Sequence, residues 1–149
     1  MTNIRLEKPR HGWSQLHIVD WHGDLSYVGD PASELLEAVN NVLVKSKPYA
    51  VRLDAEDYEY WVVFDLFDIH VICESGSGYE LHSFKITINE AANALVEQID
   101  TDFDEWAAFP CYLTTDEERQ RHRNQLDMLL GLVRYRAKTK GVPNEETVL

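Results

Sequence analysis

The sequence predicts an α+β fold: an antiparallel β-sheet of about five or six strands with about three helices, packed mainly on one face. Two observations lead to this prediction. Several segments, among them 58–64 and 69–73, alternate apolar and other residues with the period of a β-strand. Others, among them 35–43 and 92–106, repeat apolar residues at the spacing of one helix face.

The length and composition indicate one domain over residues 1–149. The chain has 149 residues and 44% of them are hydrophobic, which suffices for a core of ordinary size. Residues 1–12 are polar and basic, so we expect a loose N-terminal arm. Residues 13–140 contain all the periodic segments and form the predicted globular core. We expect residues 141–149 to be a disordered tail.

The first predicted elements are a hairpin and a helix. Residues 13–21 alternate as a strand, and His22-Gly23-Asp24 predicts a turn before a second strand at 25–28. A helix follows, because Asp30 or Ser33 can cap it and Pro31 suits its first turn. Its apolar positions, 35, 36, 39, 42 and 43, form one stripe, and Pro48 ends it.

A second hairpin forms the centre of the predicted sheet. Residues 49–53 predict a strand, and residues 58–64 predict the next one, with Tyr58 and Tyr60 on one face and Trp61 on the other. A turn over 65–68 leads into a strand at 69–73. The Ser-Gly-Ser-Gly segment at 75–78 predicts a further turn, and residues 79–88 predict the last strand.

Two helices complete the predicted fold. Asn89 can cap a helix over 90–106, whose buried stripe includes Phe103 and Trp106. Thr114 or Thr115 can cap a helix over about 116–138, and Thr115 with Glu118 has capping-box spacing. Residues 117–125 are wholly polar, so we expect the first half of this helix to project into solvent or onto a partner.

The chain has no motif of a catalytic, metal or cofactor site. Its two cysteines, Cys73 and Cys111, have no close-spaced partner, and we expect free thiols in a cytoplasmic protein, with one disulfide between them as the alternative. No His-x-x-x-His pair occurs, and no apolar stretch approaches the roughly 20 residues of a membrane helix. We therefore expect no enzyme, no cofactor and no membrane contact. An unrecognised enzyme or small-molecule site built on Cys73, His70 and His82 remains an alternative.

Charge is the strongest global feature of the sequence. The net charge is −12, and residues 20–105 carry 19 acids against 4 bases, whereas residues 106–140 carry 4 acids against 7 bases. A field this negative repels nucleic acids and anionic membranes and speeds encounter with basic proteins. We expect a basic protein partner, although acidic charge that only maintains solubility is an open alternative.

The densest acidic cluster leads directly into the most aromatic strand. Carboxylates this close repel one another, a cost that a structural turn need not carry. We interpret the cluster as a partner-binding site with aromatic anchors, and a solvated turn is the alternative. A basic run at 119–123 can pair with this acidic half or bind an acidic group. The candidate partner-binding residues are Asp54, Glu56, Asp57, Tyr58, Glu59, Tyr60 and Trp61.

Several short signatures resemble those of small acidic bacterial proteins of the immunity type. They are Ser-Tyr-x-x-Asp at 26–30 before Leu35-Leu36, Glu-x-x-Tyr-x-Trp at 56–61, a turn through Asp at 65–68, and Phe109-Pro110 before the last helix. Together they cover about residues 13–133. The resemblance implies an immunity partner of a bacterial toxin, and it brings no catalytic residues.

These observations predict a non-catalytic acidic protein that covers the basic active site of a toxin, such as a nuclease. The carboxylates of the cluster would then mimic phosphates and pair with Arg or Lys of the toxin. A self-associating structural or regulatory module, such as a homodimer, is the alternative class.

Overall fold

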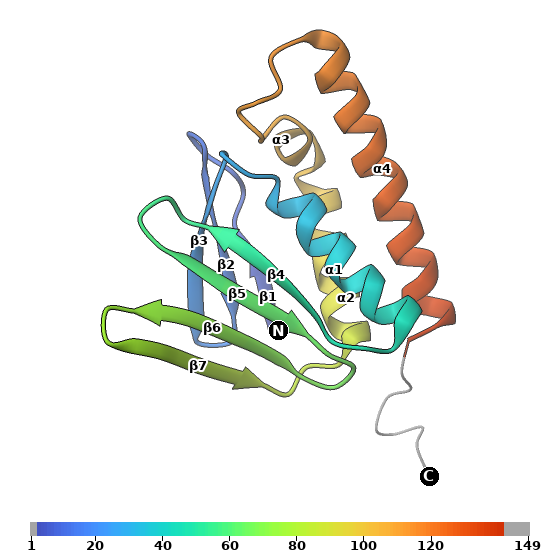
Figure 1. Ribbon diagram of the computed structural model, residues 1–149. Coiled ribbons are helices and arrows are strands. Elements are labelled where there is room, and N and C mark those ends of the chain that lie inside the picture. The colour runs from blue at the N-terminus through green and yellow to red at the C-terminus, as the bar shows by residue number, and fades with distance from the viewer. Residues whose placement is uncertain (1–2, 142–149) are drawn as a thin grey trace.

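The computed structural model describes residues 3–141 and has an α+β architecture in layers (Figure 1). The described strands form two antiparallel sheets, and the helices lie to one side of them, as predicted. The strands are β1 (Ile4–Leu6), β2 (Trp13–Ile18), β3 (Trp21–Ser26), β4 (Tyr49–Asp54), β5 (Glu59–Phe64), β6 (Ile69–Ser75) and β7 (Gly78–Phe84). The helices are α1 (Pro31–Lys45), α2 (Ile88–Thr101), α3 (Phe103–Ala107) and α4 (Asp116–Thr139).

The first sheet has the strand order β1-β2-β3. Its β2–β3 hairpin turns at Val19 and Asp20, with Val19 at a φ of 55°, and Ile18 pairs with Trp21. The predicted turn at His22-Gly23-Asp24 was therefore wrong, because these residues lie inside β3. The Val19 N–H donates to the Asn3 carbonyl oxygen at 2.8 Å, a tertiary contact that stabilises this unusual conformation of a β-branched residue.

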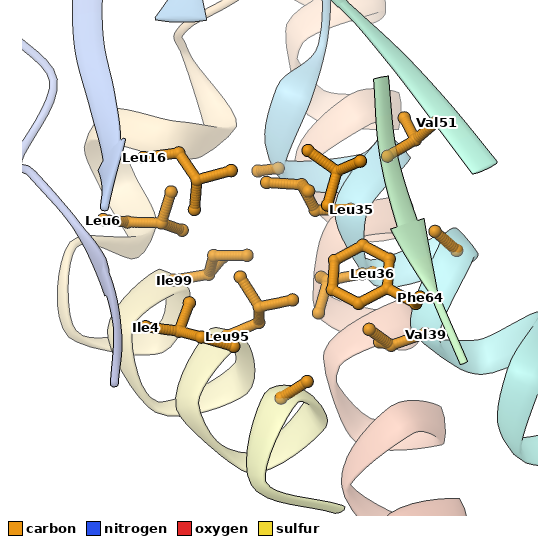
Figure 2. Close-up of a cluster of buried hydrophobic side chains, with 14 of the residues drawn as sticks. Ile4, Leu6, Leu16, Leu35, Leu36, Val39, Val51, Phe64, Leu95 and Ile99 are labelled. Atoms are coloured by element: carbon orange, nitrogen blue, oxygen red, sulfur yellow. The ribbon is translucent and has the colours of Figure 1, made fainter. Parts of the chain in front are cut away.

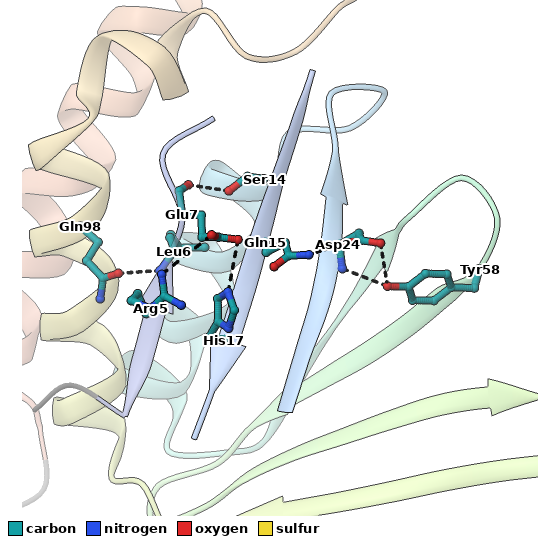
Figure 3. A network of polar contacts seen from close by, with 9 residues as sticks. All are labelled: Arg5, Leu6, Glu7, Ser14, Gln15, His17, Asp24, Tyr58 and Gln98. Atoms are coloured by element: carbon teal, nitrogen blue, oxygen red, sulfur yellow. Dashed lines mark hydrogen bonds and ion pairs between the residues drawn. The ribbon is translucent and has the colours of Figure 1, made fainter. Parts of the chain in front are cut away.

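The predicted loose arm was also wrong, because Ile4–Leu6 pairs with β2 as strand β1. Ile4 and Leu6 are buried. Gln98 of α2 then binds the other side of β1, with its Oε1 atom 2.5 Å from the Leu6 amide nitrogen and its Nε2 atom 2.6 Å from the Ile4 carbonyl oxygen. Figure 3 shows the bond to Leu6. The side-chain amide of Gln98 thus bonds to backbone groups at the outer edge of this sheet.

The second sheet has the strand order β4-β5-β6-β7 and contains the predicted central hairpin. The Asp65 N–H donates to the Asp68 carbonyl oxygen at 2.9 Å and closes the β5–β6 turn where it was predicted. On β5, Tyr60, Val62 and Phe64 point into the core, as the alternation predicts. Strand β7 ends at Phe84, four residues before the predicted end at position 88.

The prediction of a single sheet was wrong because β3 and β4 do not pair as strands. The hydroxyl of Tyr60 donates to the Asp24 carbonyl oxygen at 2.8 Å. The Asp24 N–H donates to the Tyr58 hydroxyl at 3.0 Å, a bond that Figure 3 shows. Side chains of β5 and its turn therefore occupy the edge of β3 that a further strand would need. The edge of β3 faces the inner side of the second sheet.

The helices form two layers beside the sheets. Helix α1 packs on β4 and α2 packs on β1, while α4 lies across both on the outside (Figure 1). Asp30 caps α1 as predicted, since its carboxylate accepts a hydrogen bond from the Ser33 amide. The core joins both sheets to both inner helices (Figure 2). Its labelled members include Ile4, Leu6, Leu16, Leu35, Leu36, Val39, Val51, Phe64, Leu95 and Ile99.

The predicted helix over 90–106 is two helices. Asp102, with φ −109° and ψ 38°, separates α2 from α3. The cap of α2 is Thr87, whose hydroxyl accepts from the Glu90 amide at 3.3 Å, and Asn89 instead donates to the Ala137 carbonyl oxygen. Phe103 is only partly buried, whereas Trp106 is in the core as predicted.

Helix α4 begins at the predicted cap, Thr115, but the Glu118 carboxylate contacts the Thr115 hydroxyl and not the backbone N–H that a complete capping box would engage. The Glu118 amide donates to the Thr115 hydroxyl at 3.1 Å, and that hydroxyl lies 3.0 Å from the Glu118 carboxylate. The expectation that residues 117–125 project freely was wrong at one position, because His122 is only 8% exposed. The predicted tail at 141–149 lies outside the described residues, except for Gly141.

Candidate functional site

The acidic cluster predicted from the sequence lies at the β4–β5 turn. Glu56 and Asp57 form a two-residue loop, closed by a 2.8 Å hydrogen bond from the Ala55 amide to the Tyr58 carbonyl oxygen. Glu56 has a φ of 70°, and its amide donates to the Asp54 carboxylate at 2.7 Å. Buried Ala55 anchors the loop, which leaves both acidic side chains of the turn exposed.

The four carboxylates of the cluster differ in how they are engaged. The Ser26 hydroxyl donates to Glu56 Oε2 at 2.5 Å, and Glu59 lies 3.3 Å from Arg52. Asp54 stands opposite Glu59 across the β4–β5 ladder. Asp57 is exposed, and its carboxylate has no hydrogen-bond or ion-pair partner among residues 3–141. Asp57 is therefore the carboxylate of the cluster most available to a partner.

The structure corrects the role expected of Tyr60. Its side chain is 0% exposed, and its hydroxyl is bonded to the Asp24 carbonyl oxygen, so it cannot contact a partner. Tyr58 is half exposed, but its hydroxyl donates to the Asp24 carboxylate at 3.2 Å (Figure 3). Burial raises the pKa of both phenols. Tyr60 is thus a core residue that joins the two sheets.

Trp61 points to the opposite face of β5 from Tyr60, and this outer face carries an apolar row. The ladder registers place Trp61 opposite Ile72 and Ile72 opposite Leu81. Trp61 is 37% exposed, Leu81 is 66% exposed, and Tyr79 beside them is 72% exposed. No helix or other strand of the described chain packs on this face, since α1 and β3 cover the inner one.

Carboxylates border the apolar row on the side of the β4–β5 turn. Asp54, Glu59 and Glu74 point to the same outer face, and Glu74 stands opposite Tyr79. A surface hollow of about 550 Å³ lies at this end, lined by Asp54, Glu56, Asp57, Tyr58, Glu59, Glu74 and Gly76. All its charged lining residues are acidic. We call the apolar row together with this acidic border the outer face of the second sheet.

Part of this surface was predicted from the sequence. Asp54, Asp57, Glu59 and Trp61 were predicted and lie on it or at its border. Ile72, Glu74, Tyr79 and Leu81 were missed, because strand alternation assigns each to a face but does not say which face stays uncovered. The signal was present in Leu81, an apolar residue on the otherwise polar face of its strand.

The basic run at 119–123 is engaged within the chain. Arg123 lies 2.7 Å from Asp104, and Arg119 lies 3.1 Å from Asp116. His122 Nε2 lies 2.8 Å from Asp30 Oδ2. Pairing of the basic run with the acidic half, an alternative left open by the sequence, is therefore realised by Arg123 and His122, whereas Arg119 pairs within α4.

The residues of the alternative enzyme site do not all lie on one face of the sheet. His82 and Cys73 point to the inner face of the sheet, whereas His70 lies on the outer face and hydrogen-bonds Ser83 at 2.8 Å. Cys73 and Cys111 are both free thiols. Burial raises the pKa of the Cys73 thiol above its ordinary value, and a hydrogen bond with Trp21 offsets only part of this rise. Within residues 3–141, no group of three or more His, Cys, Asp and Glu side chains is arranged to hold a metal ion.

No protein-family model, curated protein or solved structure matches the chain. None of the helices described here has the length and apolar character needed to cross a membrane. The case for a function therefore depends on the geometry of the surface.

Proposed function

We propose that the protein is a non-catalytic, immunity-type inhibitor that binds a basic bacterial toxin domain through the outer face of its second sheet. The observation that carries the proposal is an uncovered sheet face with Trp61, Ile72 and Leu81 at its centre and carboxylates along one border. Protein interfaces commonly have this arrangement of a desolvated aromatic and aliphatic centre within a polar rim.

The negative charge of this surface favours a partner with a basic binding site. Asp57 and Glu74 have no charged partner among residues 3–141, and the whole chain carries −12. An enzyme that binds phosphates, such as a nuclease, presents Arg and Lys in its active site, and carboxylates can occupy those positions. The sequence signatures that resemble immunity proteins are the reason for proposing that the basic partner is a toxin. We expect the inhibitor to act in the cytoplasm.

The experiment is a paired co-purification from the bacterial host. Tagged wild-type protein should capture a basic protein in a one-to-one ratio, and the captured protein should be toxic when expressed alone. The double variant Trp61→Ser and Leu81→Ser should lose the captured protein. Met128→Ser, which alters an exposed apolar residue on α4, is the matched control and should retain it. Equal capture by all three proteins would refute the outer face as the site.

Self-association is the second candidate, favoured by the exposure of Leu81 and Tyr79 on the edge strand β7. Two copies joined through these residues would bury an apolar surface, but their acidic borders would repel each other. Sedimentation of the purified protein separates the candidates. A dimer that the Trp61→Ser and Leu81→Ser variant dissociates would favour the self-associating module, and a monomer would favour the inhibitor.

A further inference from the structure

A groove of about 490 Å³ runs along strand β4, on the side away from β5. Every residue of Tyr49–Asp54 lines it, so the groove follows the strand over its whole length. Its other walls are the end of β3, the β3–α1 connection and the first turns of α1. These walls contribute Leu25, Ser26, Val28, Gly29, Pro31, Glu34 and Glu37.

The edge of β4 that faces the groove has unpaired backbone groups. Antiparallel ladders alternate between hydrogen-bonded and non-hydrogen-bonded residue pairs. The bond from the Ala55 amide to the Tyr58 carbonyl oxygen identifies Ala55 and Tyr58 as a hydrogen-bonded pair, and every second pair along the ladder from there is hydrogen-bonded too. Leu53 and Val51 therefore bond with β5, while the N–H and C=O groups of Ala50 and Arg52 point outward. Within residues 3–141 these outward groups have no hydrogen-bond partner.

The other edges beside the core are closed. Gln98 bonds to the backbone of β1, and the Tyr58 and Tyr60 hydroxyls bond to the backbone of β3. Strand β7 has an open edge too, but none of its residues lines any of the five surface hollows characterised within residues 3–141. Strand β4, in contrast, combines an open edge with a groove. An open edge of this kind is a template for an added strand.

The charges along the groove specify its occupant. Glu34, Glu37 and Asp54 line it, and none forms an ion pair within the described residues. Arg52 is the one cationic lining residue, and its guanidinium pairs with Glu59. Burial, followed by the nearby charges of Asp30 and Glu37, raises the pKa of Glu34 to about 7. The carboxylates therefore repel one another until a cation enters.

We propose that β4 accepts an extended, lysine- or arginine-rich segment of a partner protein as an additional strand of the second sheet. The backbone of the segment bonds to the outward groups of Ala50 and Arg52, and every second side chain reaches the carboxylates of Glu34 and Glu37. This inference goes beyond the proposed function, because it concerns a different surface and holds for any partner that presents such a segment.

The first test uses an acetylated and amidated peptide of eight residues in which lysine alternates with threonine. Titrated into the wild-type protein, it should bind at least about tenfold more tightly than the peptide with glutamate in place of lysine. In the complex, hydrogen exchange of the Ala50 and Arg52 amides should slow at least about tenfold by NMR. No binding, or binding without protection of these two amides, would overturn the proposal.

The second test separates backbone pairing from simple charge attraction. Arg52→Pro removes an outward N–H without removing a bond to β5, and edge strands tolerate proline at such positions. Arg52→Thr is the matched control, because it removes the same charge and the same ion pair with Glu59. We expect Arg52→Pro to bind the lysine peptide at least about tenfold more weakly than Arg52→Thr. Equal affinities would show that no strand is added.

A chemical variant of the peptide gives the same information if Arg52→Pro does not fold. Methylation of alternate backbone nitrogens removes the donors that face β4 and leaves the lysine charges unchanged. The methyl groups can be placed either on the odd-numbered or on the even-numbered residues of the peptide. Wild-type protein should bind one of these two peptides at least about tenfold more weakly than the unmethylated peptide, and should bind the other without this loss. Equal binding of both methylated peptides would overturn the proposal. Neither result bears on capture of a toxin by the outer face, so the two proposals can fail separately.

Discussion

His122 Nε2 lies 2.8 Å from Asp30 Oδ2, while His122 Nδ1 lies 2.7 Å from the Ala107 carbonyl oxygen. Both neighbours are acceptors, so both ring nitrogens donate and the imidazole is charged. Asp30 is also the N-terminal cap of α1. One buried histidine on α4 thus joins the start of α1 to the end of α3.

Replacing this histidine should lower stability much more than replacing its neighbour. His122→Ala removes two hydrogen bonds and leaves Asp30 without its cation, at a cost of about 2–3 kcal/mol in the free energy of unfolding. Urea denaturation at about pH 6 measures it. The control is Arg121→Ala, an exposed neighbour that we expect to cost less than about 0.5 kcal/mol. Similar losses for both variants would refute the bridging role.

The same contact predicts a pH dependence of stability. The hydrogen bond with Asp30 raises the pKa of His122 above its ordinary value of 6.5. The stabilisation is therefore complete below pH 6.5 and is lost as pH rises through the folded-state pKa. The difference in unfolding free energy between wild type and His122→Ala should shrink from pH 6 to about pH 9. An NMR titration with a His122 midpoint below 6.5 would contradict this.

Glu34 gives a second pH dependence, in a lower window. Its pKa rises from 4.5 to about 7 in the folded protein, so ionisation between these values costs stability as pH rises. Glu34→Gln should therefore stabilise the protein at about pH 8 and have no effect near pH 4. Because this partly desolvated side chain keeps access to water, which screens its charge, we expect a gain of only about 0.5 kcal/mol. Thermal unfolding of both proteins at the two pH values measures this gain. A lower stability of Glu34→Gln than of wild type at about pH 8 would contradict the prediction.

Tyr60 should matter for stability and not for partner binding. Tyr60→Phe leaves the Asp24 carbonyl oxygen without its donor and should cost about 1 kcal/mol. Affinity for the captured toxin should be unchanged, because the ring is buried between the sheets. Calorimetry of folding and of binding on the same variant tests both statements. Weaker toxin binding by a Tyr60→Phe variant of unchanged stability would show that Tyr60 contributes to the interface.

Sequence reasoning succeeded where a local rule determines the structure. The caps at Asp30 and Thr115 and the turn over Asp65–Asp68 were all predicted, since each depends on residues that are near in sequence. The free cysteines also agree with the prediction.

Several of the errors share one physical cause, which is a contact between distant segments. Strand β1 has only three residues and is held by β2 and by Gln98 on α2. The split into two sheets depends on the tyrosine hydroxyls that occupy the edge of β3. Burial of His122 depends on Asp30, which is 92 residues away in sequence. Periodicity assigns faces, but it cannot say which face or edge a distant segment will cover.

The candidate site followed the same pattern. The acidic cluster and Trp61 were identified because composition alone marks them. Ile72 and Leu81 became part of the site only through the ladder register that aligns them with Trp61.

The most direct test of the proposed function is the affinity of the captured toxin for two charge variants. Asp57→Lys with Glu74→Lys reverses the charge at two positions of the acidic border, and neither side chain has a charged partner within the described chain. Glu97→Lys with Asp127→Lys makes the same change in net charge on exposed helix positions. We expect the first variant to bind at least about tenfold more weakly than wild type, and the second to bind about as well as wild type. Equal weakening of both would mean that only net charge matters, and it would contradict binding through the outer face.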